Sequence, residues 1–126
     1  MDTDRTPLVK DVMTTPLKTI SNDATVREAA TQLRDHNISG LFVPGVSVGI
    51  ITTTDVTDAV AKNKDLSEAT VTDEMTAPVE RVTTEDELTQ AAAMMTNFGI
   101  KHLPVVDTDG DFIGMVSMTD ITAYLA

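Results

Sequence analysis

The apolar residues of this 126-residue chain follow a helical period in two segments. In each segment positions i, i+3, i+4 and i+7 are apolar, and these are Val26, Ala29, Ala30 and Leu33, and again Leu88, Ala91, Ala92 and Met95. Such spacing places four side chains on one face of an amphipathic helix. The opposite face of the first helix would carry Arg27, Glu28, Arg34 and Asp35. Asn37 and Gly99 come after the periodic residues and predict the helix ends.

Short apolar runs after these helices predict β-hairpins. Residues 102–117, "HLPVVDTDGDFIGMVS", contain two apolar runs around Asp109-Gly110, which is a common hairpin turn. In the first half of the chain the turn is reduced to "VPGVSV", with the bend at Pro44-Gly45. A second helix is expected after each hairpin, over residues 55–62 and from 120 to the end of the chain. With the extended segments around Ile20 and Val82, each half predicts the order βαββα.

The elements recur because the chain contains the same sequence twice. "MTTPL" at Met13 returns as "MTAPV" 62 positions later, whereas "GIITTTDV" at Gly49 returns as "GMVSMTDI" 65 positions later. Three residues are therefore missing from the first copy, between Leu41 and Gly49. We predict a repeat over residues 8–62, a polar linker over 63–73 and a second repeat over 74–126. One repeat buries too little surface to be stable alone, so the two are expected to pack together as an α/β (α+β) protein.

Composition and charge exclude several classes of function. A net charge of −11 repels nucleic-acid phosphates, which argues against DNA or RNA binding. The chain has no cysteine, so disulfides and thiolate metal sites are excluded. No apolar run approaches the roughly 20 residues of a membrane span, and "MDTDRTPLVK" is not typical of a signal peptide. We expect a cytoplasmic protein whose acidic surface resembles those of salt-loving organisms.

The sequence shows no nucleophile–base pair, metal-ligand cluster or glycine-rich phosphate loop, which argues against catalysis. The pattern that recurs is a hydroxyl residue three positions before an aspartate, Thr52-x-x-Asp55 and Ser117-x-x-Asp120. One interpretation is a capping box that only starts a helix. The other is a ligand site, because a helix N-terminus offers free N–H groups to an anion and a carboxylate can accept two hydrogen bonds from a ribose diol. Both interpretations remain open at this stage.

The whole chain resembles a tandem pair of cystathionine-β-synthase (CBS) domains, known as a Bateman module. The resemblance rests on "VKDVMTTPLKTISNDATVREAATQL" with "VTDEMTAPVERVTTEDELTQAAAMM", on "NISGL" with "GIKHLPVVD", and on the two octapeptides. It implies two βαββα repeats packed sheet to sheet about a pseudo-two-fold axis, with two clefts between the sheets. The family's ligands are adenine nucleotides or related adenosyl compounds, such as AMP, ADP, ATP or S-adenosylmethionine.

The resemblance also implies ligand-binding residues. Asp55 and Asp120 would hold ribose, and the hydroxyl residues near the ribose or phosphate would be Thr52, Thr54, Ser117 and Thr119. The wall of one adenine pocket would be Pro16, Leu17, Ile38, Ser39 and Gly40. The wall of the other would be Pro78, Val79, Ile100, Lys101 and His102. The family's pattern pairs Asp120 with the first wall and Asp55 with the second. One departure is that Phe42 stands where the second copy has Pro104.

These features predict a non-catalytic sensor without a resident cofactor or metal. A bound adenosyl ligand would change the tilt of the repeats, and a regulated partner protein would read that change. A homodimer is expected through the helix faces around Ala29, Leu33, Ala91 and Met95, although these stripes could equally be buried within the monomer. The alternative is a ligand-free interaction module in which both aspartates only cap helices. His36 is expected at the surface, and His102 either in a pocket wall or on a partly exposed strand.

Overall fold

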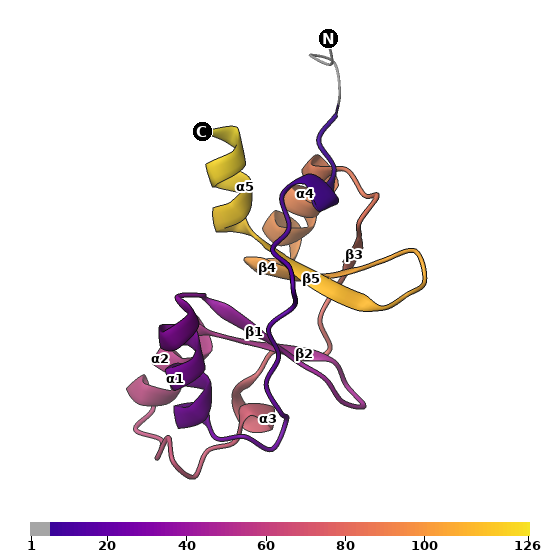
Figure 1. Cartoon of the computed structure of the whole chain (residues 1–126). Helices are drawn as coiled ribbons and strands as arrows, with labels where there is room; N and C mark the ends of the chain where they lie inside the picture. Colours follow the sequence, from indigo (N-terminus) through magenta and orange to yellow (C-terminus); the bar gives the residue numbers. More distant parts are fainter. Residues whose placement is uncertain (1–5) are drawn as a thin grey trace. The chain divides into compact units, whose positions relative to one another are not determined.

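The computed structural model describes residues 6–126 and has mixed α+β architecture, which confirms the predicted fold class (Figure 1). The first five residues, which belong to the segment tested for a signal peptide, lie outside the described part. The elements of the first half are η1 (Val9–Asp11), α1 (Val26–His36), β1 (Gly40–Val43), β2 (Gly49–Thr52) and α2 (Thr53–Ala61). Those of the second half are α3 (Val71–Glu74), β3 (Val82–Thr83), α4 (Leu88–Phe98), β4 (His102–Val106), β5 (Phe112–Ser117) and α5 (Met118–Leu125).

Helix α1 begins and ends for local chemical reasons. The Thr25 hydroxyl accepts a hydrogen bond from the Glu28 N–H at 3.1 Å, and Glu28 accepts one from the Thr25 N–H at 3.1 Å, which is a capping box. The helix stops at Asn37, whose φ of 52° is left-handed. Helix α4 stops in the same way at Gly99, with a φ of 64°. Both predicted helix ends are confirmed.

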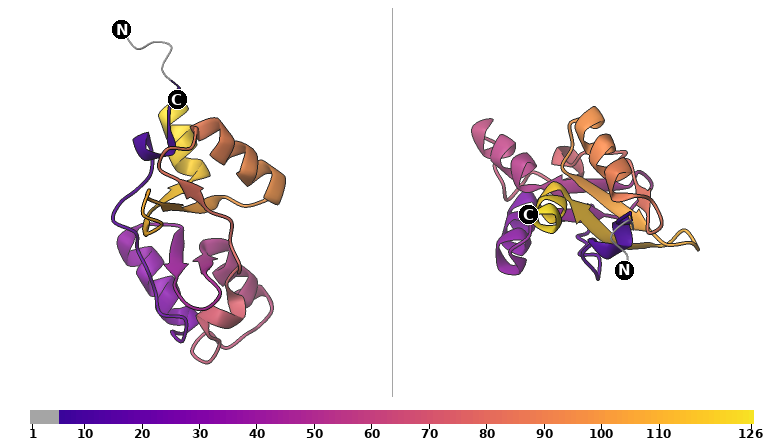
Figure 2. Two further views of the ribbon diagram at one scale, coloured as in Figure 1. Left: turned by 90° about the vertical axis from the view of Figure 1, so that its right-hand side faces the viewer. Right: turned by 90° about the horizontal axis from the view of Figure 1, so that it is seen from above.

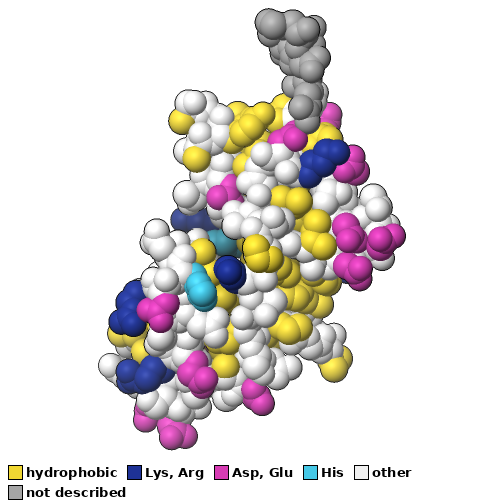
Figure 3. Space-filling view, in the orientation of Figure 1, with side chains coloured by type: hydrophobic (Ala, Val, Ile, Leu, Met, Phe, Trp, Pro, Cys, Tyr) yellow, Lys and Arg dark blue, Asp and Glu magenta, His cyan; other side chains and the backbone are white. Residues whose placement is uncertain are grey.

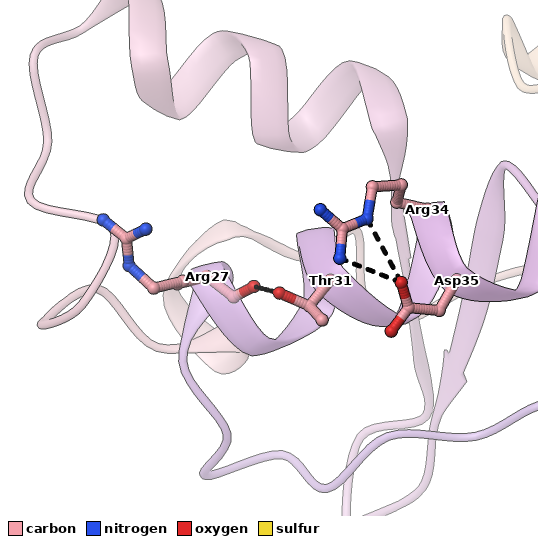
Figure 4. A network of polar contacts seen from close by, with 4 residues as sticks. All are labelled: Arg27, Thr31, Arg34 and Asp35. Atoms are coloured by element: carbon pink, nitrogen blue, oxygen red, sulfur yellow. Dashed lines mark hydrogen bonds and ion pairs between the residues drawn. The ribbon is translucent and has the colours of Figure 1, made fainter.

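The exposed face of α1 is polar, as its sequence pattern predicts. Figure 4 shows the Arg34 guanidinium directed at Asp35, with Nε and Nη2 lying 3.1 and 3.0 Å from Oδ1. The Thr31 hydroxyl donates to the Arg27 carbonyl oxygen one turn back, at 3.1 Å. Solvent-exposed pairs of this kind contribute little to stability. They keep this face in water while the opposite face is buried.

The chain folds into two compact units whose bounds differ from those of the sequence repeats. We name residues 18–79 the central unit, and residues 6–17 together with 80–126 the terminal unit. The segment before Lys18 belongs to the first repeat in sequence but to the unit of the second repeat in space. Likewise, residues 63–79 complete the unit of the first repeat. The opening segment of each repeat is therefore part of the unit that contains the rest of the other repeat.

Equivalent hydrogen bonds fix both exchanged segments. In the terminal unit Thr14 and Met115 exchange backbone hydrogen bonds of 2.8 and 3.1 Å. In the central unit Thr76 and Ile50 do the same, at 2.9 and 3.0 Å. Thr14 and Thr76 are the same position of the two repeats, and so are Ile50 and Met115. The exchange is thus a property of the repeat and occurs twice.

The predicted polar linker, residues 63–73, does more than connect the repeats. The carbonyl oxygens of Leu66 and Ala69 accept hydrogen bonds from the N–H groups of Arg27 and Val26, at 3.0 and 2.9 Å. These N–H groups belong to the first turn of α1, which has no partner for them within the helix. Val71, at the start of α3, is fully buried in the central core. This segment is therefore part of the central unit.

Each unit has a sheet with a helical layer and its own core (Figure 2). In the central unit β1 and β2 are antiparallel, and Thr19 bridges Phe42 in parallel. In the terminal unit β3 is parallel to β4, and β4 is antiparallel to β5. The central core comprises Ile20, Ala29, Leu33, Leu41, Val43, Ile51 and Val71. The terminal core comprises Val9, Val82, Leu88, Ala91, Met95, Leu103, Val105, Val116 and Ile121.

The two hairpins differ in their strands and not in their turns. The connecting loops, residues 44–48 and 107–111, are equally long, so the prediction of a shorter first turn is wrong. The second hairpin has one further pair, Val106 with Phe112, and a register shift beside it. The three missing residues correspond to this pair and to Ile113. The first hairpin therefore lacks the last residue pair of the strand ladder and the register shift beside it, and its connecting loop keeps the full length.

The apolar stripes proposed as a dimer interface are inside the protein. Ala29 and Ala91 are completely buried, and Leu33 and Met95 are 5% and 1% exposed. They contribute to the cores of their own units. The alternative interpretation, burial within the monomer, is therefore correct. Any contact between copies has to use other side chains.

The exchanged segments lead to a prediction about fragments. We expect residues 18–79 to fold alone, because they contain every contact of the central unit and domains of about 60 residues can be stable. Residues 8–62 form a complete sequence repeat but lack Val71, the carbonyl groups that cap α1 and the Thr76 bridge. We expect this second fragment to be unfolded.

Circular dichroism and urea titration of the two purified fragments provide the measurement. The central fragment should give a cooperative transition, and the sequence repeat should not. A Val71→Ala change in the central fragment, which removes a fully buried side chain, should lower its stability by about 1–3 kcal/mol. Equal stability of the two fragments would contradict the assignment of the units.

Candidate functional site

The glycine of each repeated octapeptide permits the close crossing of an exchanged segment. A Cβ atom added to Gly114 would lie 2.8 Å from the Thr14 carbonyl oxygen. A Cβ atom added to Gly49 would lie 2.6 Å from the Met75 sulfur and 3.0 Å from the Thr76 carbonyl oxygen. Backbone oxygens at such distances cannot move without breaking the bridges described above. The first residue of the motif is therefore explained by packing.

In the central unit the hydroxyl–aspartate pair forms a capping box at the start of α2. The Thr52 N–H and hydroxyl donate to Asp55 Oδ2 at 2.8 and 3.0 Å, and the Asp55 N–H donates to the Thr52 hydroxyl at 3.3 Å. The helix begins at Thr53, two residues before the predicted start. The carboxylate is only half-buried. Both hydrogen bonds that the described residues donate to it go to the same oxygen, so Oδ1 retains its lone pairs for a ligand.

The terminal unit repeats this arrangement at the start of α5. The Ser117 N–H donates to Asp120 Oδ2 at 3.0 Å, and the Asp120 N–H donates to the Ser117 hydroxyl at 3.0 Å. The helix begins at Met118, again two residues early. Ser117 is one of the few buried polar residues, and its cap satisfies it. The capping interpretation is therefore correct in both copies, and it does not exclude the ligand interpretation.

The residues just before β1 and β4 are held at these same helix starts. The Ser39 carbonyl oxygen accepts a hydrogen bond from the Thr53 N–H at 3.0 Å. At the equivalent place the Lys101 carbonyl oxygen accepts one from the Met118 N–H at 2.9 Å. His102 is paired with Ser117 across the β4–β5 ladder. Lys101, His102, Ser117 and Asp120 are thus neighbours in the terminal unit.

The two sites have different electrostatic surroundings. Burial raises the pKa of the Asp55 carboxyl; the hydrogen bonds from Thr52 oppose this shift, and the negative charges of Asp58 and Glu74 add to it. In the terminal unit burial lowers the pKa of the His102 imidazole; the Asp120 carboxylate opposes this shift, and the Lys101 charge adds to it. The central site therefore combines acidic groups, and the terminal site combines acidic and basic ones.

Each unit holds half of the predicted ligand-binding residues. The central unit contains Ile38, Ser39, Gly40, Thr52, Thr54, Asp55, Pro78 and Val79. The terminal unit contains Pro16, Leu17, Ile100, Lys101, His102, Ser117, Thr119 and Asp120. In each set one proline follows a cis peptide bond, Thr15-Pro16 or Ala77-Pro78. The expected pairing of each aspartate with walls that include residues of the other unit stays a prediction.

Exposure differs among these residues in the same way in both sets. The threonines inside the helices, Thr54 and Thr119, are exposed, and so are the two prolines. Leu17, Val79, Ile38 and Ile100 are half-buried. His102 is half-buried, as expected for a partly exposed strand residue, whereas His36 is exposed at the end of α1, which confirms its predicted surface position. A ligand at either helix start would find both polar and apolar groups within its own unit.

Sequence reasoning missed two acidic neighbours of Asp55. Asp58 lies one helical turn further along α2, and Glu74 lies at the end of α3. The Glu74 side chain is only 6% exposed, and its Oε2 is 2.5 Å from Lys64 Nζ. A signal was present, because the second copy has Glu74 directly before Met75 where the first copy has Val12 directly before Met13. Comparison of the copies position by position would have found it.

Figure 3 shows acidic side chains spread over the visible face of the molecule, which agrees with the net charge of −11. Within residues 6–126, no group of three histidine or acidic side chains is arranged to hold a metal ion. In the same part of the chain no helix is long and apolar enough to cross a membrane.

Known proteins share both the sequence and the fold. A 17.7 kDa protein of Acidianus ambivalens is 35% identical over 120 residues, which cover 93% of this chain and 72% of that protein. The L-aspartate semialdehyde sulfurtransferase of Methanosarcina acetivorans is 33% identical over 127 residues, but the match covers only 25% of that enzyme. The crystal structure of the CBS domain pair of protein MJ0100, in complex with 5′-methylthioadenosine and S-adenosyl-L-methionine, matches with a TM-score of 0.84 and 30% identity. The match covers 96% of this chain and 97% of that one.

The family described as CBS domain matches the chain twice, over residues 9–62 and 69–126. These two matches follow the internal duplication and include both octapeptides with their capping boxes. The chain belongs to the CBS domain family, and it contains a tandem pair of these domains.

Proposed function

We propose that this protein is a non-catalytic sensor of adenosyl ligands, which binds them at the starts of α2 and α5 and signals to a partner protein. The observation that carries the proposal is the repeated capping aspartate, which keeps one carboxylate oxygen for a ligand in each unit. A ribose offers two neighbouring hydroxyl groups as donors, and a carboxylate accepts such pairs well. The helix N–H groups beside it suit the phosphate of a nucleotide.

Similarity to ligand-binding pairs supports this proposal. The domain pair of MJ0100 holds 5′-methylthioadenosine and S-adenosyl-L-methionine, and it matches nearly all of this chain at 30% identity. The sulfurtransferase contains a similar pair as a quarter of its length, which is consistent with a module that attaches to different activities. For such a module the ligand acts by binding two states of the protein with different affinity, and the partner responds to the state that is favoured.

An alternative function is a ligand-free interaction module, and the two capping boxes favour it, because they explain the aspartates without any ligand. A thermal-shift screen separates the two functions. AMP, ADP, ATP, adenosine and S-adenosylmethionine would be tested at high salt, and a ligand of the folded state should raise the melting temperature. The absence of any shift at millimolar ligand would favour the interaction module.

The first functional prediction concerns the two aspartates. Asp55→Asn and Asp120→Asn should each weaken nucleoside binding at one site by about 1.5–3 kcal/mol, because a charged acceptor for the ribose is lost. Little loss of stability is expected, since asparagine also forms good caps. Isothermal titration calorimetry of both variants gives the affinities, and circular dichroism shows whether the fold is retained.

A matched control is available on α1. Glu28→Gln alters the acid of a capping box that lies outside both proposed sites, with the same hydrogen bond to a threonine N–H. This variant should keep full affinity for the ligand. If both aspartate variants also keep full affinity, their role is limited to capping.

We further propose that the protein forms a homodimer through the terminal unit. Helix α4 has no charged residue, although the chain carries a net charge of −11, so two copies can approach there with the least repulsion. Phe98 at the end of α4 is 55% exposed, and Tyr124 and Leu125 of α5 are 51% and 70% exposed. Exposed apolar side chains of this size are typical of contact surfaces.

Light scattering at several concentrations tests the dimer. The expected mass is twice that of the 13.5 kDa chain, and Phe98→Lys together with Tyr124→Lys should give a monomer. Val46→Lys is the control, because Val46 is a fully exposed apolar residue in the β1–β2 loop and belongs to the central unit. A monomer at every concentration of the unmodified protein would refute the interface.

A further inference from the structure

The two proposed sites are built on equivalent positions but differ in their local charges. Ser39 and Gly40 in the central unit correspond to Lys101 and His102 in the terminal unit. Conversely, the acidic Asp58 and Glu74 of the central unit correspond to Ala123 and Val12 of the terminal one. At each of these places, one copy therefore has a charged or titratable side chain near the capping aspartate where the other copy has a neutral residue.

Glu74 is held in a fixed position near Asp55 of the central unit. Its carboxylate is nearly buried, and the Lys64 ammonium that pairs with it is 41% exposed. Helix α3 is fixed by Val71 in the core and by its N-terminal cap, in which the Asp73 N–H donates to Thr70 Oγ1 at 3.3 Å. A buried carboxylate is less screened than its exposed partner, so the Glu74 charge is felt toward Asp55 more strongly than the Lys64 charge.

Asp58 adds a second negative charge on α2. It lies three positions after Asp55, so the two side chains share one face of the helix. Like charges at this spacing repel each other, and burial of Asp55 makes the repulsion stronger. Helix α3, which carries Glu74, packs against α2, so both acids lie near the capping carboxylate; after burial itself, both also raise the pKa of Asp55.

The acidic groups do not form a chelating site. Among the described residues no three acidic or histidine side chains converge closely enough to hold a metal ion. They produce a negative electrostatic potential over the start of α2. This potential strengthens the binding of an adenosyl ligand that also carries a positive charge. In the terminal unit Lys101 and His102 adjoin Asp120, and the positive charge of Lys101 favours a phosphate instead.

We propose that the two sites select adenosyl ligands of opposite charge: the Asp55 site prefers a ligand with a cationic group at the 5′ side, such as a sulfonium, and the Asp120 site prefers a phosphorylated one. Asp58 and Glu74 are the specificity-determining residues of the first site, and Lys101 is that of the second. This inference rests on the proposed adenosyl-binding function. It goes further because it assigns each chemical class of ligand to one site.

Three probes with the same adenosine group separate charge from adenosyl recognition. S-adenosylmethionine has a sulfonium and a net charge of about +1 near neutral pH, 5′-methylthioadenosine is uncharged, and AMP is an anion. Calorimetry would use the full chain with Asp120→Asn, which leaves the Asp55 site, and with Asp55→Asn, which leaves the Asp120 site. With the Asp55 site alone, S-adenosylmethionine should bind roughly threefold to tenfold more tightly than 5′-methylthioadenosine, and AMP should bind most weakly. With the Asp120 site alone the order should be reversed.

Charge-neutralising variants then test the named residues. In the Asp120→Asn protein, Glu74→Gln and Asp58→Asn should each bring the affinity of S-adenosylmethionine closer to that of 5′-methylthioadenosine, and leave the latter nearly unchanged. Asp58 is exposed, so its variant keeps the test decisive if Glu74→Gln disturbs the fold. Glu68→Gln is the matched control, because it removes the same charge from an exposed position of the central unit and should not change the ratio.

The outcomes distinguish this inference from the function on which it rests. The charge selection would be overturned, and the adenosyl site retained, if the Asp55 site bound all three probes with equal affinity. The same holds if the Glu74 and Asp58 variants lost equal affinity for S-adenosylmethionine and 5′-methylthioadenosine. Binding of none of the probes to the unmodified protein would refute both. A ratio that Glu68→Gln lowers as much as Asp58→Asn would show that only net charge matters, and would overturn the assignment of these two residues.

Discussion

The structure depends on two close backbone crossings, Thr14 with Met115 and Thr76 with Ile50. Each crossing attaches the opening segment of one repeat to the hairpin of the other, and each requires a glycine because no side chain fits beneath the crossing backbone. The strand that carries this glycine leads directly into the capping box, so the crossing also determines where the helix begins. Core, hairpin and candidate site are thus linked through one contact in each unit.

The capping aspartate shows how a structural group can also serve a ligand. One oxygen accepts the hydrogen bonds that begin the helix, and these bonds hold the carboxylate in a fixed position. A ligand that uses the second oxygen meets an acceptor that is already ordered, so little side-chain entropy is lost on binding. The surrounding charges then differ between the copies without any change in the cap itself. Duplication in this way preserves the scaffold and allows each site to acquire its own selectivity.

Local signals in the sequence predicted most of the fold. The helical period, the stops at Asn37 and Gly99 and the repeated octapeptide gave the elements and their order, because capping and periodicity act over a few residues. The exchange of segments was not predicted, since nothing in the sequences "MTTPL" and "MTAPV" indicates which of the two hairpins each segment contacts. The missing three residues were assigned to the turn, because a sequence alignment cannot tell a shorter loop from shorter strands.

Charges that meet only in three dimensions were also missed. The hydroxyl–aspartate pairs could be found because they are close in sequence, and the basic residues at the start of β4 were recognised for the same reason. Glu74 lies 19 positions from Asp55 in the chain, and only the packing of α3 beside α2 brings the two together. Its burial against Lys64 depends on that packing as well. Pairwise electrostatics of this kind require the structure.

The central unit is a continuous stretch of chain inserted into the terminal one. During synthesis from the N-terminus, the central unit is complete once residue 79 has emerged, whereas the bridge of Thr14 to Met115 has to wait for β5, some 100 residues behind it. Domains generally fold as units while the chain is made, so the inner unit has the chance to form first and the outer one closes last. Vectorial synthesis therefore gives two sequence-related halves different folding histories, and the half that closes last is the one exposed longest to other chains.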